Sequence, residues 1–211
     1  MQKRNQVNHL YWIFHFSINF YMKTLCRLKL SGVDNIPLTG GLIIASNHIA
    51  GADPFLLGST VPRELWFMAK KELFEPFLLG HLISRVNAFP VDRFNFDLDA
   101  IKKSISFLKE GKVLIMFPEG TRSTNGQIKE GKIGVGMLAQ KAGVSIVPVY
   151  IENTKKAWWN LFLRKRMKVT FGRIIESGWI CSQARSKEGY KIITDKLMNR
   201  LKELQTAAKT S

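Results

Sequence analysis

Cysteine and acidic residues are scarce in this sequence, and long apolar runs are absent. The 211 residues include two cysteines, Cys26 and Cys181, which lie far apart and form no CxxC pair. This pattern predicts neither a metal-binding cysteine framework nor a disulfide scaffold, and a reducing compartment is the default expectation. No segment reaches the roughly 18 apolar residues that a membrane-spanning helix needs.

The scarcity of acidic residues leaves a strong excess of positive charge. There are 32 Lys and Arg against 16 Asp and Glu, a formal net charge of +16. Because 45% of the residues are hydrophobic and 23% are charged, the composition is that of a folded domain and excludes a disordered basic tail. The excess predicts an anionic partner: nucleic acid, an anionic membrane surface or a phosphorylated substrate.

The segment Leu10 to Met22 is the most apolar part of the chain. Polar residues interrupt it and no small-residue cleavage site follows, so it does not match a signal peptide. Six of its thirteen residues are aromatic, and the basic residues around it are Lys3, Arg4, Lys23, Arg27 and Lys29. An interfacial membrane helix is one interpretation. A helix packed on the protein's own core is a second, and a strand is a third, because alternate residues from Trp12 to Phe20 are apolar.

After residue 40 the chain alternates between short apolar runs and helical patterns. The predicted strands are Leu42–Ala45, Leu65–Ala69, Ala88–Val91, Val113–Phe117, Val144–Ile151 and Met167–Phe171. Five helices are predicted. The first starts at Pro54 with Asp53 as its N-cap, and the second covers Leu73–Arg85. The others run from Asp97 or Asp99 to Gly111, over Lys132–Ala142, and along the apolar stripe from Tyr190 to Leu204. The alternation predicts a single α/β domain with a largely parallel central sheet flanked by helices, and ligands at the carboxyl ends of its strands.

His48 lies just after the first predicted strand, and Asp53 follows five positions later. An aspartate that accepts a hydrogen bond from one imidazole nitrogen fixes the tautomer, and it stabilises the imidazolium that forms when the other nitrogen takes a proton. The pair therefore fits a general-base dyad. Spacing alone leaves two alternatives open. In one, Asp53 only caps its helix; in the other, the pair belongs to a metal site, which needs more ligands than lie nearby.

Two further stretches place polar and charged groups beside predicted strand ends. The segment Phe117–Ser123, with sequence FPEGTRS, combines a glycine that permits close backbone approach, a hydroxyl and a planar arginine fork, which suit a phosphate or carboxylate. Lys70, Lys71 and Arg93 add positive potential near it. Taken singly, each stretch is more typical of a solvated turn on the surface.

Together these segments resemble the glycerolipid acyltransferase family, in particular the bacterial lysophosphatidic acid acyltransferases. Four motifs occur in the family's order: His48 with Asp53, Lys70–Leu73 with Pro90–Arg93, Phe117–Ser123, and Ile146–Val149. The resemblance covers about residues 30–205. One departure is Asn87, which stands where a glycine is common before the Phe-Pro-Val-Asp-Arg run.

The resemblance implies an acyltransferase domain at residues 30–205, a membrane-associating helical segment at 1–29 and a tail at 206–211. A fatty acyl group would pass from an acyl-CoA or acyl carrier protein thioester to the free hydroxyl of 1-acyl-glycerol 3-phosphate, forming phosphatidic acid. No metal, cofactor or acyl-enzyme is expected.

The resemblance also assigns roles residue by residue. His48 is the general base, and Asp53 orients it and stabilises its charged form. The phosphate of the acceptor is held by Arg122 with Lys70 and Arg93. The full set of implied substrate-binding residues is Lys70, Arg93, Glu119, Gly120, Thr121 and Arg122.

The remaining basic and aromatic residues point to partners. The stretch from Lys155 to Arg166 mixes Trp and Phe with Lys and Arg, which suits anionic lipid or single-stranded nucleic acid. Given the motifs, we expect a peripheral or monotopic protein on the cytoplasmic face of a membrane, with no nucleic-acid partner. His9 and His15 are predicted to be interfacial and His81 structural. The alternatives are another acceptor, such as glycerol 3-phosphate, a basic nucleic-acid-binding protein, or a non-catalytic membrane-surface protein.

Overall fold

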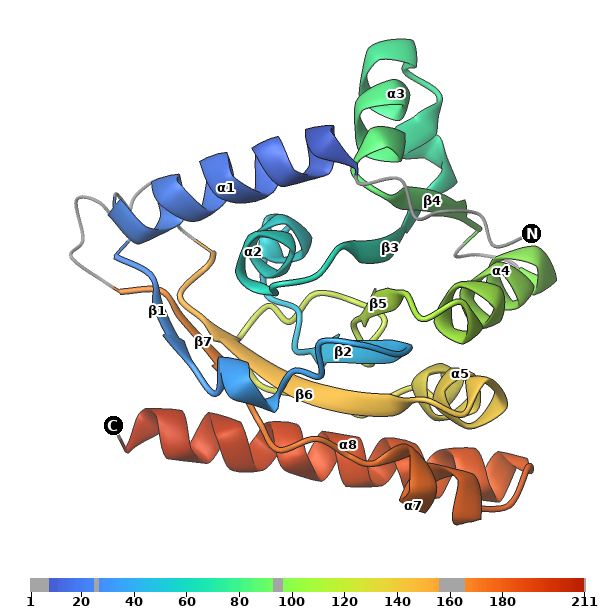
Figure 1. The fold of residues 1–211 in the computed structure, drawn as a ribbon. Coiled ribbons are helices and arrows are strands. Elements are labelled where there is room, and N and C mark those ends of the chain that lie inside the picture. Colours follow the sequence, from blue (N-terminus) through green and yellow to red (C-terminus); the bar gives the residue numbers. More distant parts are fainter. Residues whose placement is uncertain (1–7, 25–26, 93–96, 156–165, 211) are drawn as a thin grey trace.

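A seven-stranded sheet with helices on both faces forms the body of the computed structural model (Figure 1), which describes residues 8–24, 27–92, 97–155 and 166–210. The strands are β1 (Lys29–Ser31), β2 (Leu42–Ser46), β3 (Leu65–Lys70), β4 (Ala88–Val91), β5 (Val113–Met116), β6 (Ser145–Glu152) and β7 (Lys168–Phe171). Their order across the sheet is β1-β7-β6-β2-β5-β3-β4. All neighbours are parallel except β6 and β7, so the predicted α/β class with a largely parallel sheet is confirmed.

Helices cover the two faces of the sheet unequally (Figure 1). The helices are α1 (His9–Thr24), α2 (Asp53–Thr60), α3 (Phe77–Arg85), α4 (Leu98–Lys109), α5 (Gly134–Ala142), α7 (Ser177–Ser182) and α8 (Lys187–Lys209), with 3-10 turns η1 (Val33–Asn35) and η2 (Lys71–Phe74). α1 and α2 lie on one side, and α5, α7 and the long α8 lie on the other. α3 stands out beyond the sheet near β4.

The centre of the core is β2, whose five side chains are all buried. A strand buried on both faces is apolar throughout, as this one is except at its last residue. Leu42 and Ile44 belong to a cluster with Leu57 of α2, and Ile43 belongs to a second cluster with Leu197 of α8. Each such side chain contributes roughly 1.5–3 kcal/mol through burial, so the two clusters hold β2 rigidly between the layers.

The sheet order determines which loops meet. β2 is flanked by β6 and β5, and β3 lies beyond β5. These four strands are mutually parallel, so their carboxyl ends lie at one edge of the sheet. The segments that leave this edge contain His48, Lys70, Phe117–Ser123 and Thr154. Residues far apart in the sequence therefore come together there.

Two of the local sequence predictions are wrong. Asp53 begins α2 but does not cap it, since Ala52 is the N-cap residue and contributes no side-chain bond. The predicted helix over Leu73–Arg85 is divided into η2 and α3 at Pro76. A proline has no N–H to donate, so a continuous helix through Pro76 would lose a hydrogen bond.

Two local features follow from turn and cap chemistry. Asn87, between α3 and β4, has a φ of 66°, a left-handed conformation that asparagine tolerates better than most residues. The departure from glycine at this position therefore keeps the turn. Asp97 is the N-cap of α4, and its Oδ1 accepts a hydrogen bond from the Ala100 N–H at 2.8 Å, as the sequence predicts.

The N-terminal segment is the helix α1, so the strand interpretation is wrong. Tyr11 fixes its inner side, because the Tyr11 hydroxyl accepts a bond from Leu65 N–H at 3.0 Å and donates one to Gly58 O at 3.1 Å. The outer side exposes Ile13, Phe16 and Phe20 to solvent. Among the helices that the structure describes, α1 included, none has the length and apolar character to cross a membrane.

Candidate active site

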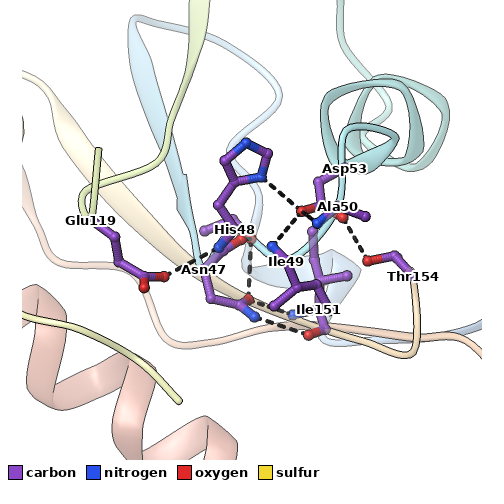
Figure 2. Close-up of polar contacts among 9 residues, drawn as sticks. Asn47, His48, Ile49, Ala50, Asp53, Glu119, Ile151 and Thr154 are labelled. Carbon is purple, nitrogen blue, oxygen red and sulfur yellow. Dashed lines mark hydrogen bonds and ion pairs between the residues drawn. The ribbon is translucent and has the colours of Figure 1, made fainter. Parts of the chain in front are cut away.

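His48 and Asp53 form a direct pair at the carboxyl end of β2 (Figure 2). The Nδ1 atom of His48 lies 2.8 Å from Oδ2 of Asp53. A carboxylate only accepts hydrogen bonds, so this contact assigns the proton to Nδ1 and leaves Nε2 as the basic nitrogen. The side chain of His48 is 13% exposed and that of Asp53 is fully buried. The ring can therefore meet a substrate from one side while its partner stays shielded from water.

The carboxylate of Asp53 is held by four hydrogen bonds. Besides His48, the backbone N–H groups of Ile49 and Ala50 each donate to Oδ2 at 2.8 Å. The Thr154 hydroxyl donates to Oδ1 at 2.6 Å, and its side chain is also buried. These bonds explain why Asp53 does not cap α2: its side chain turns back and organises the loop that carries His48. A buried charge needs this many partners to offset its desolvation.

The backbone of His48 is clamped by the loop that follows β5. Glu119 accepts the His48 N–H at 3.2 Å through Oε1 and the Lys129 N–H at 3.1 Å through Oε2. The carbonyl oxygen of His48 accepts the Ser123 N–H at 2.7 Å. The ring of Phe117 stacks on the imidazole, with centroids 4.0 Å apart and planes at 20°. The predicted FPEGTRS segment thus supports the histidine from three directions.

A second clamp comes from Asn47, which is buried. Its side-chain amide donates to Ile151 O at 3.0 Å and accepts from Ile151 N–H at 2.8 Å. The two bonds extend the pairing of β2 with β6 by a side chain, and they fix where the loop leaves the sheet. Glu119 and Asn47 therefore hold the dyad loop to both neighbouring strands (Figure 2).

Cationic side chains gather around the same loops. The Nη1 of Arg122 lies 3.7 Å from the point that a Cβ on Gly51 would occupy. The loop of the His48–Asp53 motif and the FPEGTRS loop therefore meet there. Gly120 has a φ of 70°, and a Cβ on it would lie 2.9 Å from the Nζ of Lys132. Lys129 donates from Nζ to the Thr121 hydroxyl at 3.3 Å. The sequence-predicted Gly120, Thr121 and Arg122 thus share one basic surface.

The other predicted substrate-binding residues have different placements. Lys70 ends β3, two strands from His48, and is exposed. Lys71 forms an ion pair with Asp92 at 2.7 Å, which ties η2 to the end of β4. Arg93 lies outside the described residues, as do residues 156–165 of the basic and aromatic stretch. Within the described ranges, no group of three or more metal-ligating side chains comes together.

An apolar cavity of about 180 Å³ lies between α1, α2 and α3. Its walls include Phe14 and Ile18 of α1, Phe55 of α2, Phe67 of β3, and Leu79 and Leu82 of α3. Pro54 and Phe55, which directly follow Asp53 in the sequence, line it, whereas His48 and Asp53 do not. His15 also lines it, with Nδ1 2.8 Å from Gly58 O, and burial lowers the pKa of His15, which keeps the ring neutral.

Comparison with known proteins accounts for this arrangement. The family model described as Acyltransferase matches residues 27–152, which contain the dyad, the basic loops and the sheet edge. The chain is 32% identical over 180 residues to the 1-acyl-sn-glycerol-3-phosphate acyltransferase of Bacillus subtilis (strain 168), covering 84% of this chain and 88% of that protein. The chain belongs to the acyltransferase family.

Other relatives support this acyltransferase assignment. The 1-acyl-sn-glycerol-3-phosphate acyltransferase of Streptococcus pneumoniae is 33% identical over 171 residues, which are 79% of this chain and 61% of that one. The crystal structure of the 1-acyl-sn-glycerophosphate (LPA) acyltransferase PlsC from Thermotoga maritima superposes with a TM-score of 0.68. The two sequences are 22% identical, and the superposed part covers 97% of this chain and 84% of the Thermotoga maritima chain. That likeness shows that the two chains share a fold.

Four residues of this acyltransferase site were not singled out by the sequence analysis: Asn47, Lys129, Lys132 and Thr154. Asn47 adjoins His48, and its position directly after a buried strand was the available signal. Thr154 follows β6 in the same way that His48 follows β2, so the strand order identifies it. The two lysines lie in the irregular stretch before α5, where no periodicity marks them.

Proposed function

We propose that this chain is a 1-acyl-sn-glycerol-3-phosphate acyltransferase that forms phosphatidic acid. The observation that carries the proposal is the His48–Asp53 contact, which leaves Nε2 of His48 basic and accessible beside a basic surface and an apolar cavity. The activity named for the Bacillus subtilis and Streptococcus pneumoniae relatives supports it. The acyl donor is a thioester of coenzyme A or of acyl carrier protein.

In the proposed step, His48 Nε2 takes the proton of the acceptor's free hydroxyl as its oxygen attacks the thioester carbonyl carbon. The new C–O bond forms, the C–S bond breaks, and the proton passes from His48 to the leaving thiolate. Asp53 stabilises the imidazolium between these events. A positioned base contributes roughly 10²–10⁴-fold, and binding both substrates side by side supplies much of the rest. No acyl-enzyme is required.

The acceptor's phosphate binds to Arg122 and the neighbouring loop in this proposal. An arginine fork and lysine ammonium groups recognise phosphate oxygens, and Lys129 and Lys132 add charge beside Thr121 and Gly120. Gly120 keeps the backbone close to the ligand, because a side chain there would meet Lys132. Lys70, at the end of β3, contributes to the potential of the same edge.

An acyl chain occupies the cavity between α1, α2 and α3 in this proposal. The lining is almost entirely apolar, and its α2 wall starts at Pro54, the residue after Asp53. A bound acyl chain therefore extends away from the dyad towards α1. We further propose that the outer side of α1, with Ile13, Phe16 and Phe20, rests on the cytoplasmic face of an anionic membrane as a peripheral or monotopic contact.

The test is an assay of free thiol release. The purified chain is incubated with acyl-CoA or an acyl carrier protein thioester and a panel of acceptors, including 1-acyl-glycerol 3-phosphate, glycerol 3-phosphate and other lysolipids. We expect thiol release with the lysophosphatidic acid acceptor, and a loss of at least about 10²-fold in His48→Ala, which should still fold. The matched control is His81→Ala, an exposed histidine on α3. No release with any acceptor, or full activity in His48→Ala, would refute the proposal.

A further inference from the structure

The exposed apolar side chains in the described part of the chain are concentrated on α1 and on the consecutive elements η2 and α3. Eight of the thirteen large apolar side chains that are exposed in the described part of the chain lie on α1 or on η2 and α3. Phe77 and Leu78, at the first turn of α3, are each 82% exposed, and Leu82 one turn later is 44% exposed. Soluble proteins rarely leave such side chains grouped, and a grouped patch marks an interaction surface.

We propose that the tip of α3, defined by Phe77, Leu78 and Leu82, inserts into the interface of an anionic bilayer as a second contact beside α1. The proposal rests on the proposed function, in which substrate and product are lipids. It assigns a membrane contact to a segment that carries none of the catalytic motifs.

The two helices form one surface rather than two separate ones. Asn8, at the start of α1, donates to Arg85 O at the end of α3 at 2.8 Å and to the Asn87 side chain at 3.3 Å. α1 and α3 also share the walls of the apolar cavity, through Ile18 and Leu79 among others. Both helices lie on the side of the molecule opposite α8 (Figure 1). An acyl tail that enters the cavity from a bilayer therefore passes between the two helices whose outer residues would touch that bilayer.

The charge distribution favours lipid as the occupant. Neither α1 nor α3 contains an acidic residue, while Lys23 lies in the last turn of α1 and Arg85 ends α3. Arg27 and Lys29 come shortly after α1 in the chain. Glu72 and Glu75 lie on the segment that leads to the tip, directly after Lys70 and Lys71. Two positive and two negative charges leave that segment nearly neutral. Basic residues that border an apolar patch bind anionic headgroups. A second copy of this chain also carries +16 and would be repelled, so it fits the surface less well.

The first experiment measures binding of the full chain to vesicles of dioleoylphosphatidylglycerol and dioleoylphosphatidylcholine by flotation. The test variant combines Phe77→Ser with Leu78→Ser, two positions that do not line the cavity and whose exposure makes the change harmless to folding. The matched control combines Leu98→Ser with Ile192→Ser, exposed apolar residues of α4 and α8. We expect the partition coefficient to fall about tenfold or more in the test variant and to stay within about twofold in the control.

The second experiment reports insertion at the tip itself. Leu78→Cys, in a chain whose two native cysteines are replaced by serine, is labelled with an environment-sensitive fluorophore; Ile192→Cys in the same background is the control. We expect a blue shift with vesicles, and quenching by lipids brominated on their tails, at position 78 only. Solvent-like emission at position 78 on vesicles that bind the chain, or unchanged partitioning of the double variant, would overturn the proposal. So would a lipid-free dimer of the wild type that the double variant loses.

Thiol release separates this inference from the proposed function. The double variant should match the wild type on a short-chain acceptor dissolved as monomers, and it should be slower on lysolipid presented in vesicles. A wild type with no thiol release on either substrate would refute the proposed function, while the flotation and fluorescence results would still decide the role of the tip.

Discussion

The carboxyl edge of the sheet and the α1–α3 surface depart from the usual distribution of residues in opposite ways. At the sheet edge, polar side chains such as Asn47, Asp53 and Glu119 are buried, and each is fully engaged in hydrogen bonds. On the α1–α3 surface, apolar side chains such as Phe20 and Phe77 are exposed. Polar groups inside and grouped apolar groups outside both cost stability in isolation. Each departure therefore indicates a role beyond folding.

The two regions also differ in how they respond to substitution. Buried polar side chains around His48, such as Asp53 and Glu119, have hydrogen-bond partners inside the protein, so changing one leaves its partner buried and unpaired. The ring contacts of the exposed Phe16 and Phe77 are with residues of their own helices, so the tertiary fold depends little on these side chains. Substitutions at the sheet edge should alter chemistry without altering membrane binding, and substitutions at the tip of α3 should do the reverse.

The largest expected effect is that of Asp53→Asn. An amide at this position donates towards Nδ1 of His48 and favours the tautomer that carries its proton on Nε2, which removes the base. We expect kcat to fall by about 10³–10⁴-fold while vesicle partitioning stays unchanged. Asp99→Asn, an exposed position on α4, is the control. Normal turnover in Asp53→Asn would show that the pair is structural.

Arg122→Ala should give the next largest effect. Loss of a charge-assisted contact to phosphate is worth roughly 1.5–3 kcal/mol, which corresponds to a rise in KM of about 10–100-fold for the phosphorylated acceptor. The KM for an uncharged monoacylglycerol should not change. The control is Arg173→Ala. Arg173 follows β7, which is antiparallel to β6, so the chain there runs away from the edge that carries the His48 loop. An equal loss with both acceptors would assign Arg122 to loop structure instead of phosphate binding.

Thr154→Val tests a positioning residue that no motif contains. Its hydroxyl donates to Asp53 Oδ1, and valine keeps the shape but removes the donor. We expect kcat/KM to fall about tenfold, because one hydrogen bond to a charged group is lost, with little change in KM for the thioester. Thr154→Ser keeps the hydroxyl and should restore most of the rate. If serine and valine behave alike, packing rather than the hydrogen bond explains the residue.

Tyr11→Phe should have the smallest effect, and it probes the junction between the two regions. The hydroxyl accepts the buried Leu65 N–H and donates to Gly58 O, so its loss leaves a buried donor unpaired. We expect unfolding free energy to fall by about 1–2 kcal/mol in a urea titration. Tyr190→Phe, whose hydroxyl has no hydrogen bond among the described residues, is the control. No change in Tyr11→Phe would mean that the Tyr11 hydroxyl does not contribute to holding α1 in place.

The dyad and all the described strands except β1 could be predicted from the sequence because their signals are local. A short apolar run between turn residues predicts Leu42–Ala45 as a strand, and a polar Asp97 before an amphipathic stripe predicts a helix start. One of the wrong predictions concerns a residue with two competing roles. Asp53 has the chemistry of an N-cap, but its carboxylate binds His48 and the backbone of its own loop, contacts that spacing does not encode.

By itself, the sequence determined which residue types were available and where the chain turns: a histidine and an aspartate separated by four residues, the FPEGTRS loop, and an apolar, acid-free N-terminal segment. Only the tertiary structure decided which of these meet. The order β6-β2-β5-β3 places Thr154 and Glu119 on either side of His48, and the packing of α1 beside α3 joins two apolar segments into one surface. The reason is physical: propensity and periodicity act over a few residues, whereas strand order follows from burying both faces of β2 at once.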